Sequence, residues 1–587
     1  MKLSNYIIDF IRKEWTDTIF SFSGWMITHL EDSVFLNKKI QLVSVKHEQA
    51  WAFAAEWYAR SSWKTWVAMW TSWPWATNMI TWIASAYFDS VPVLYITGQV
   101  NTNEITHKTG IRQTWFQEAD IVSMVSKITK FAYQISKPEE IRYILEKSFF
   151  LANFQRKWPI VLDIPMNIQR QEIIPKELPS FFDSKEYMTI KKKEELRIKR
   201  LNKDTNNLRR VLAQSKKPVI LLWWWCKSAN VKKDIASFAK KFNIPVVVSL
   251  MWLDSIDHTI KNYIWMIGSY GNRQANIAIM NCDLLLVLWS RLDIRQTWAI
   301  KKTFCPKAKI VHIDIDDNEL GYNIEHTHVK IHQDLRDIVM KLKTIPLDKK
   351  SKRLDQLIKI KRIITTNETE KKEWKFYNIN YFFEKISNLS PKNTIYSNDV
   401  GQTQMWASQS LELSQDQQLL NCGWMWAMWF SLPSAMWAYF GNPKYKIIAI
   451  NGDGWFQLNI QELETIAHHK IPMIIIVVNN HSLWMVREFQ EAYFWWRNIW
   501  TVIGYSCPDI SKIAWAYGLT YYKIWGTTDI KKVFTNAMKE KTPTIVEVLA
   551  SNTSKLVPKV MFGNTIDNQS PELDEKIKSQ IQRILNQ

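Results

Sequence analysis

Two oxygen-bearing side chains, Asp453 and Asn480, stand where a metal ion could be held. Asp453 lies within the sequence GDG after the apolar run KIIAI, and Asn480 ends the sequence NN after the apolar run IIIVV, 27 residues further on. A helical pattern separates them, so both are expected at the carboxyl ends of neighbouring parallel strands, where open α/β sheets bind ligands. Carboxylate and amide oxygens suit Mg2+, and the flanking Gly452 and Gly454 allow the backbone to approach a diphosphate closely.

The alternative interpretation of this segment is an ordinary strand–helix–strand unit with an aspartate in a turn. GDG alone favours that alternative. GDG together with the 27-residue spacing and the asparagine pair after a strand favours a metal–diphosphate site.

Glu48 is the second candidate for chemistry. It lies in the sequence HEQ, after the apolar run QLVSV and at the start of a helical pattern. A glutamate in the first turn of a helix is usually a surface residue favoured by the helix dipole. A carboxylate held in an apolar cleft has a raised pKa instead and can exchange a proton with a ring nitrogen.

The composition limits the class of protein. The chain has 587 residues, enough for three domains. Its five cysteines are odd in number and lack CxxC spacing, which argues against a disulfide framework or a zinc site. No apolar run is long enough to span a bilayer, so a cytoplasmic protein is expected. The net charge of +20 comes from scattered lysines, which indicates a solvated surface rather than a nucleic-acid interface.

Tryptophan is abundant and glycine scarce, with 32 Trp and 15 Gly. Many tryptophans stand where a turn needs glycine, as in TSWPWATN (71–78), WWW (223–225) and CGWMWAMWF (422–430). A bulky side chain at positive φ is an outlier. We therefore interpret these tryptophans as glycine-type positions whose codon, UGA being the expected one, is read as glycine in the source organism. A protein truly rich in tryptophan is the alternative, and UGG codons at these positions would establish it. Trp406, in GQTQMWA, is expected to be a genuine tryptophan.

Strand and helix patterns alternate along the chain and predict an α/β fold with three domains, each a mainly parallel sheet flanked by helices. The expected segments are an N-terminal domain (1–175), a polar linker (176–205), a central Rossmann-like domain (206–345), a second linker (346–376), a C-terminal domain (377–551) and a tail resembling a charged helix (552–587).

These motifs resemble those of thiamine diphosphate (ThDP)-dependent enzymes, and FQLNIQELETIAHHKIP…NNHSLWMVREFQ resembles the acetolactate (acetohydroxyacid) synthase branch. The resemblance reaches to about Ala550. It implies that the N-terminal domain binds the pyrimidine ring of ThDP and the C-terminal domain binds its diphosphate with Mg2+. It also implies that Glu48 bonds the aminopyrimidine ring and promotes loss of the thiazolium C2 proton.

The resemblance assigns roles to further residues. The metal shell is Asp453, Asn480 and the carbonyl of Ser482. The cofactor contacts in the C-terminal domain are Val400, Gly401, Gln402, Gly452, Gly454 and Met428, on which ThDP folds into its V shape. Phe116, Gln117 and Lys130 match residues that line the substrate channel, although a solvated lysine is an equal alternative for Lys130. The segment 494–506 is expected to be a mobile lid.

The central domain matches the family's flavin-binding domain at the three glycine-type positions 223–225, Leu250-Met251, Arg291, Arg295 and Asp314, while Ile294 and Tyr270 replace residues of its pattern. The resemblance leaves open whether FAD is bound. Thr403 and Phe489 are further departures, the latter in the pocket for the second substrate.

The implied activity is decarboxylation of a 2-oxo acid, pyruvate first, and ligation to a second carbonyl, giving acetolactate for branched-chain amino acid synthesis. A ThDP-dependent lyase, carboligase or decarboxylase acting on another substrate, for example in cell-surface sugar synthesis, is the alternative; extra residues before FQE (100–125) favour such a subgroup. A protein of this fold without catalytic activity is a further alternative. A homodimer or homotetramer is implied; a small regulatory subunit stays open, and neither nucleic acid nor membrane is expected as a partner.

Overall fold

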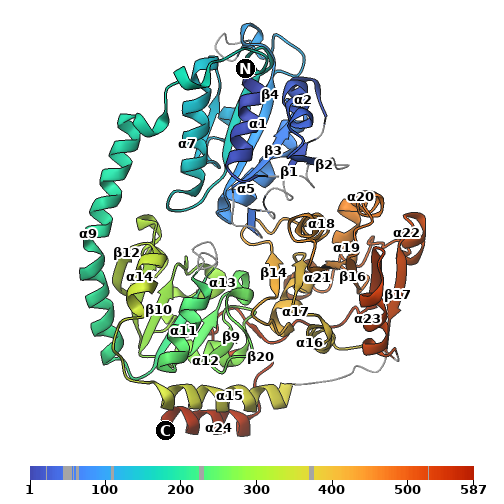
Figure 1. Ribbon diagram of the computed structural model, residues 1–587. Coiled ribbons are helices and arrows are strands. Elements are labelled where there is room, and N and C mark those ends of the chain that lie inside the picture. Colours follow the sequence, from blue (N-terminus) through green and yellow to red (C-terminus); the bar gives the residue numbers. More distant parts are fainter. Residues whose placement is uncertain are drawn as a thin grey trace. The chain divides into compact units, whose positions relative to one another are not determined.

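Three six-stranded sheets follow one another along the chain of the computed structural model (Figure 1). The structure describes residues 1–587 except 17, 22, 44–55, 57–58, 61–64, 107–110, 224–230, 325, 369–375 and 527. It divides into two compact units. They are Met1–Glu194 with Cys422–Ile447 and Trp455–Met473, and Glu195–Asn421 with Ile448–Gly454 and Ile474–Gln587.

The first sheet has the strand order β2-β1-β3-β4-β6-β5, and all of its strand pairs are parallel. Its strands are β1 (Thr18–Ser21), β2 (Gln41–Val43), β3 (Trp66–Trp70), β4 (Val93–Gln99), β5 (Phe131–Gln134) and β6 (Ile160–Pro165). The helices of this region are α1 (Leu3–Lys13), α2 (Thr28–Asn37), α4 (Trp75–Asn78), α5 (Ile80–Phe88), α6 (Ile121–Val125), α7 (Ile141–Asn153) and α8 (Met166–Gln169).

Helix α1 shows why the first sheet acquires a core. Its apolar residues Leu3, Ile7 and Ile11 recur at a spacing of four, so they lie on one face of the helix. All three are fully buried in one cluster with strand residues such as Val67 and Ile96. The apolar face of α1 therefore packs toward the sheet while its charged residues remain outside.

The second sheet has the order β12-β11-β10-β7-β8-β9, again with parallel pairs throughout. Its strands are β7 (Pro218–Leu222), β8 (Val246–Val248), β9 (Tyr263–Met266), β10 (Leu284–Leu288), β11 (Lys309–Asp314) and β12 (Thr327–His332). Its helices are α11 (Lys232–Phe242), α12 (Arg273–Met280), α13 (Ile294–Thr297) and α14 (Leu335–Leu342). The chain reverses its direction of winding between β7 and β10, which is the point where doubly wound sheets bind nucleotides.

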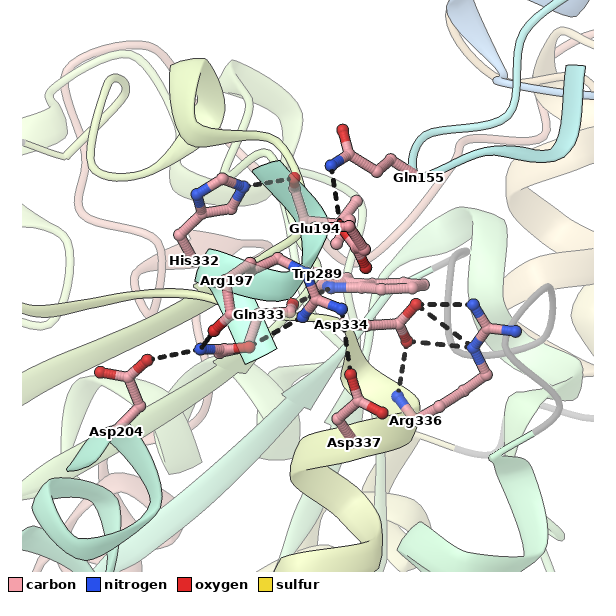
Figure 2. Close-up of polar contacts among 11 residues, drawn as sticks. Gln155, Glu194, Arg197, Asp204, Trp289, His332, Gln333, Asp334, Arg336 and Asp337 are labelled. Carbon is pink, nitrogen blue, oxygen red and sulfur yellow. Dashed lines mark hydrogen bonds and ion pairs between the residues drawn. The ribbon is translucent and has the colours of Figure 1, made fainter. Parts of the chain in front are cut away.

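The two polar stretches expected as linkers are largely helical. Helix α9 (Lys185–Gln214) runs through the first and α15 (Ser351–Glu368) through the second. Helix α9 is rich in Lys, Glu, Leu and Arg, which are good helix formers, and a buried polar cluster anchors it (Figure 2). Arg197 donates to Gln333 at 2.8 Å and pairs with Asp337 at 3.1 Å, and the Gln333 amide donates to Asp204 at 2.7 Å.

The third sheet has the order β14-β13-β15-β16-β18-β17. Its strands are β13 (Thr394–Asn398), β14 (Gln418–Asn421), β15 (Lys446–Gly452), β16 (Ile474–Asn479), β17 (Thr520–Ile524) and β18 (Thr544–Leu549). The helices of this part of the sequence are α16 (Ile379–Leu389), α17 (Gln402–Ser410), α18 (Ser431–Gly441), α19 (Asp453–Phe456), α20 (Glu462–His468), α21 (Trp484–Tyr493), α22 (Ile510–Ala516) and α23 (Ile530–Lys539). The predicted fold class is thus confirmed, with three parallel-sheet α/β domains.

The tail is more than the charged helix expected from its sequence. A two-stranded antiparallel sheet of β19 (Lys559–Val560) and β20 (Gln569–Ser570) precedes helix α24 (Glu575–Asn586). The Gln569 carbonyl accepts from buried Arg273 at 2.9 Å, and the Gln569 amide donates to Gly271 at 2.7 Å. None of the described helices is both long and apolar enough to cross a membrane.

The backbone marks many tryptophans as glycine-type positions. Among the described residues, eighteen residues other than glycine have positive φ, and nine of these are Trp: 15, 265, 289, 298, 426, 429, 495, 496 and 500. The left-handed region costs an ordinary residue about 1–2 kcal/mol because Cβ crowds the following carbonyl. The genuine tryptophan expected at 406 lies instead inside helix α17 and is buried.

Trp15 illustrates the pattern at the end of helix α1. Its φ is 67°, its amide donates to the Arg12 carbonyl, and the Thr16 amide donates to the Ile11 carbonyl. These two bonds form the Schellman motif, whose left-handed residue is usually glycine. Trp15 is 71% exposed, so its indole contributes little burial in return.

We expect Trp15→Gly to raise the stability of the protein by about 1 kcal/mol, because it relieves the left-handed strain and removes little packing. Glu14→Gly is the matched control: Glu14 is exposed and has an ordinary φ of −78°, so glycine there lowers stability by up to about 1 kcal/mol. Thermal unfolding midpoints of the two variants measure both effects. Destabilisation by Trp15→Gly would contradict the glycine interpretation at this position.

Candidate cofactor and active site

Neighbouring strands bring Asp453 and Asn480 to one edge of the third sheet. Strands β15 and β16 pair in parallel with Gly452 opposite Val478. Asp453 follows Gly452 directly, and Asn480 comes two residues after Val478. Both side chains are buried. The structure thus has the strand arrangement expected from the sequence for a carboxylate and an amide at the carboxyl ends of adjacent strands.

The Asp453 carboxylate is poorly solvated. Burial raises its pKa to about 6, while the Tyr505 hydroxyl, the charge of His481 and the amides of Asp453 and Gly454 act in the opposite direction. The same proximity to Asp453, added to burial, raises the pKa of Tyr505. A carboxylate withdrawn from water in this way gains much from a cation that replaces its hydration.

Gly454 allows a close approach of side chains beside Asp453. A Cβ added at Gly454 would lie 2.6 Å from the Leu483 side chain and 3.2 Å from the Tyr505 hydroxyl. Any larger residue would therefore push away the segment that carries Tyr505. Glycine is required here for packing against the turn that follows β16.

Asn480 is oriented by its neighbours. Its side-chain oxygen accepts from the Ser482 amide at 3.1 Å, and its amide group donates to Gln402 at 3.3 Å. Gln402 in turn donates to the Ser554 carbonyl at 3.0 Å. The Ser482 hydroxyl donates to the Thr501 carbonyl at 2.9 Å. Three of the predicted cofactor or metal residues, Gln402, Asn480 and Ser482, thus form one hydrogen-bonded group.

Val400 and Gly401 form the turn that leads into helix α17. Val400 is buried, and its amide donates to the Asp399 side chain at 2.8 Å. Gly401 precedes the helix with φ 94° and ψ −156°, which essentially only glycine adopts. This turn follows β13, which is next to β15 in the sheet.

The donor set of this edge fits a hard cation and a diphosphate. Asp453 and Asn480 supply oxygens of the kind that Mg2+ prefers. Because the Asp453 carboxylate is buried, a bound cation would replace the hydration that it lacks. Gly401, at positive φ before helix α17, allows close approach to the backbone. Val400, Gly401, Gln402, Gly452 and Gly454 are the residues that would lie along the diphosphate.

The remaining predicted residues of the C-terminal and N-terminal domains belong to the other unit. Met428 is half-buried in the loop between β14 and α18. Gln117 is half-buried with φ 64°, and its carbonyl accepts from the Ser72 hydroxyl. The Lys130 ammonium donates to the carbonyls of Phe154 and Arg156, which gives it a structural function in its own domain. Glu48 lies outside the described residues.

In the central domain, the predicted flavin residues follow adjacent strands. Arg291 comes after β10 and pairs with Glu319 at 3.0 Å, Asp314 ends β11 and is buried, and Arg295 is exposed. Trp289 alters this edge of the sheet: its indole donates to the Gln333 carbonyl, at 3.5 Å, after β12 (Figure 2). The indole thus spans the carboxyl edge from β10 to the turn after β12.

Two groups of residues had not been predicted from the sequence. Tyr505, within the segment expected as a lid, faces Asp453. A buried charged cluster joins Glu56, Arg60 and Asp89: Arg60 pairs with Asp89 at 2.6 Å and also contacts Glu56. The spacing of Glu56 and Arg60, one helical turn apart in an otherwise apolar stretch, was the available signal.

Family models match the chain in three consecutive parts. They are the N-terminal TPP binding domain of thiamine pyrophosphate enzymes at residues 1–124, the central domain at 205–342 and the C-terminal TPP binding domain at 399–548. The chain therefore belongs to the family of thiamine pyrophosphate (thiamine diphosphate) enzymes.

Within this family the chain is similar over its full length to acetolactate synthase large subunits. It is 31% identical to the probable acetolactate synthase large subunit of Methanocaldococcus jannaschii over 98% of this chain and 97% of the relative. It is 30% identical to the chloroplastic acetolactate synthase of Arabidopsis thaliana, over 98% and 85% of the two chains. The large subunit from Lactococcus lactis is 31% identical, over 95% and 94%.

Asp453→Asn is expected to weaken Mg2+-dependent binding of thiamine diphosphate by at least about 100-fold, because a neutral amide replaces the charged oxygen ligand. Titration calorimetry with and without Mg2+ measures the loss. Asp509→Asn, at an exposed helix start in the same unit, serves as the control and should bind normally. Equal binding by Asp453→Asn and the unchanged protein would remove Asp453 from the metal site.

The raised pKa of Glu56 predicts how the stability of the protein depends on pH. Burial, and then the charge of Asp89, raise its pKa from 4.5 to about 7 against the opposing effect of Arg60. Between these values the folded protein keeps a proton that the unfolded chain has lost, so stability falls as pH rises through this window. Relative to Glu56→Gln, the unchanged protein should lose up to about 3 kcal/mol between pH 4.5 and 7. A pH-independent difference between their unfolding curves would show that Glu56 titrates normally.

Proposed function

We propose that this enzyme decarboxylates a 2-oxo acid, pyruvate in the first instance, and joins the remaining acyl unit to a second carbonyl compound. Thiamine diphosphate and Mg2+ are the proposed cofactors, and acetolactate is the product when pyruvate is also the acceptor. The observation that carries the proposal is the buried pair Asp453 and Asn480 at adjacent strand ends, within the part matched by the C-terminal TPP binding domain. The names of the full-length relatives favour acetolactate synthesis.

Each proposed residue has a distinct task. Asp453, Asn480 and the Ser482 carbonyl would hold Mg2+ and with it the diphosphate, and the turn at Val400-Gly401 would lie beside the diphosphate. Glu48 would hold a proton at the pyrimidine ring, and Met428 would support the cofactor. When bound, thiamine diphosphate supplies the electron sink that decarboxylation of a 2-oxo acid requires. Gln117 is proposed to line the path of the substrate.

A ThDP-dependent carboligase or decarboxylase with another substrate is the second candidate. The observation that favours it is the segment before FQE, where Glu118 binds two residues of that segment. The Glu118 carboxylate accepts from the Thr106 hydroxyl at 2.7 Å and from the Thr114 amide at 2.9 Å. These contacts fix Thr106 and Thr114 next to Glu118, which directly follows Gln117 in the sequence.

The other proposals concern assembly and flavin. At least a homodimer is proposed, since in the family the residue matching Glu48 acts on a cofactor held by another subunit. FAD binding is proposed for the central domain, where Arg291 and Asp314 lie at the ends of the adjacent strands β10 and β11. Branched-chain amino acid synthesis is the proposed pathway for an acetolactate product.

The decisive experiment supplies pyruvate, thiamine diphosphate and Mg2+ and measures CO2 release together with the products formed. We expect acetolactate, and a loss of CO2 release of at least about 100-fold in Glu48→Gln, because the amide cannot exchange the proton. The assay is run on the printed chain and on one with glycine at the glycine-type positions.

Other outcomes separate the candidates. Acetaldehyde with CO2 and no acetolactate would identify a decarboxylase. A protein that binds thiamine diphosphate with Mg2+ but leaves pyruvate unchanged would favour the second candidate. Absence of cofactor binding in both chains would overturn the proposed function.

A further inference from the structure

The Asp89 carboxylate receives three hydrogen bonds inside the first unit. One oxygen accepts from Arg60 at 2.6 Å and from the Gly423 amide at 3.0 Å, and the other accepts from the Trp424 amide at 3.0 Å. Asp89 directly follows helix α5 and is buried, and Gly423 lies 334 residues further along the chain. A carboxylate that binds two consecutive amides fixes both the position and the direction of that backbone.

Gly423 is required for this contact. A Cβ added there would lie 2.5 Å from the nearer Asp89 oxygen and 3.0 Å from the carboxyl carbon, so the loop or the carboxylate would have to shift. The glycine therefore lets the two amides reach the carboxylate. It is one of the glycines that the printed sequence retains in this otherwise tryptophan-rich loop.

The loop that Asp89 holds is the one that carries Met428. It runs from Gly423 to Phe430, between β14 and α18, and contains Trp426 and Trp429 at positive φ. Near its other end, the Trp429 carbonyl accepts from buried Asn459 at 3.0 Å. Met428 thus lies between two backbone anchors, and neither anchor depends on the side chains at the glycine-type positions.

Arg60 and Glu56 are the other members of the buried charged cluster that contains Asp89. The Arg60 guanidinium is fully buried and balances Asp89. Burial raises the pKa of the Glu56 carboxyl to about 7. Near neutral pH Glu56 can therefore carry a proton, which avoids a second negative charge in the cluster. The positive charge of Arg60 therefore lies beside the carboxylate that binds the loop amides.

We propose that Asp89 is a positioning residue, which holds the loop Gly423–Phe430 so that Met428 is placed for the cofactor. The claim that Met428 is placed for the cofactor rests on the proposed function. The claim that Asp89 holds the loop is independent of that function, because it concerns only contacts within the chain.

The test uses the full-length chain and two variants. Asp89→Asn keeps the shape of the side chain but replaces one acceptor oxygen with an NH2 group that faces a loop amide. Gly423→Ala keeps every charge, but its methyl group pushes the loop away from the Asp89 carboxylate. We expect each variant to speed hydrogen–deuterium exchange of the 422–430 peptide by about tenfold or more without cofactor. We also expect each to weaken binding of thiamine diphosphate by about tenfold.

The matched control is Asp334→Asn. Asp334 is similarly buried, pairs with Arg336 at 2.7 Å and accepts from the Arg336 amide at 2.8 Å, but in the central domain (Figure 2). It should leave exchange of the 422–430 peptide unchanged, and far-UV circular dichroism of all variants reports whether they fold. Should Asp89→Asn unfold, Gly423→Ala provides the answer alone.

The outcomes distinguish the two claims. Unchanged exchange of the loop in folded Asp89→Asn and Gly423→Ala would overturn the positioning function. Faster exchange with unaltered cofactor affinity would overturn the link to Met428. If the unchanged protein binds no thiamine diphosphate, the proposed function fails, while the exchange measurement still decides whether Asp89 holds the loop.

Discussion

The parallel pairing of β15 with β16 is the constraint on which the proposed site depends. Parallel strands require a crossover connection, and here the crossover carries the helices between Asp453 and Ile474. The register, with Gly452 opposite Val478, decides that the residues after both strands emerge at the same edge. A slip of one residue would turn the side chains to opposite faces. Both strands are buried on both faces, so a slip would disturb the packing of their isoleucine and valine side chains on each face.

Burial of charge is the second organising feature. Asp453 and Glu56 both have raised pKa values because the surrounding protein excludes water. The two carboxylates have different neighbours. Glu56 pairs with Arg60, whereas Asp453 lies beside the Tyr505 hydroxyl, His481 and the amides of Asp453 and Gly454. A carboxylate paired with arginine stabilises a local structure, and one beside hydroxyl and amide groups at a strand end suits a cation from solution.

Much of the fold followed from the sequence because alternating strand and helix patterns are regular. The three sheets and the strand-end positions of Asp453 and Asn480 are of this kind. The long helix α9 was expected as a linker because its sequence is mostly polar and charged. Its few buried residues are Arg197, Thr205, Leu208 and Leu212, and Arg197 forms a hydrogen bond with Gln333. The Asp89 contact was also beyond prediction, since two amides 334 and 335 residues away carry no side-chain signal. Tyr505 was missed for a similar reason, because a loop residue's direction depends on the packing around it.

The positive φ of Trp15 has a practical consequence for anyone who produces this protein. It is the first of the glycine-type positions marked by the backbone, and it lies directly after helix α1. If its codon is UGA, an expression host that uses the standard code stops there and releases a peptide ending at Glu14, little more than one helix. Failure to express the protein would then result from the genetic code of the host and not from an inability of the chain to fold. A synthetic gene with ordinary glycine codons removes that obstacle.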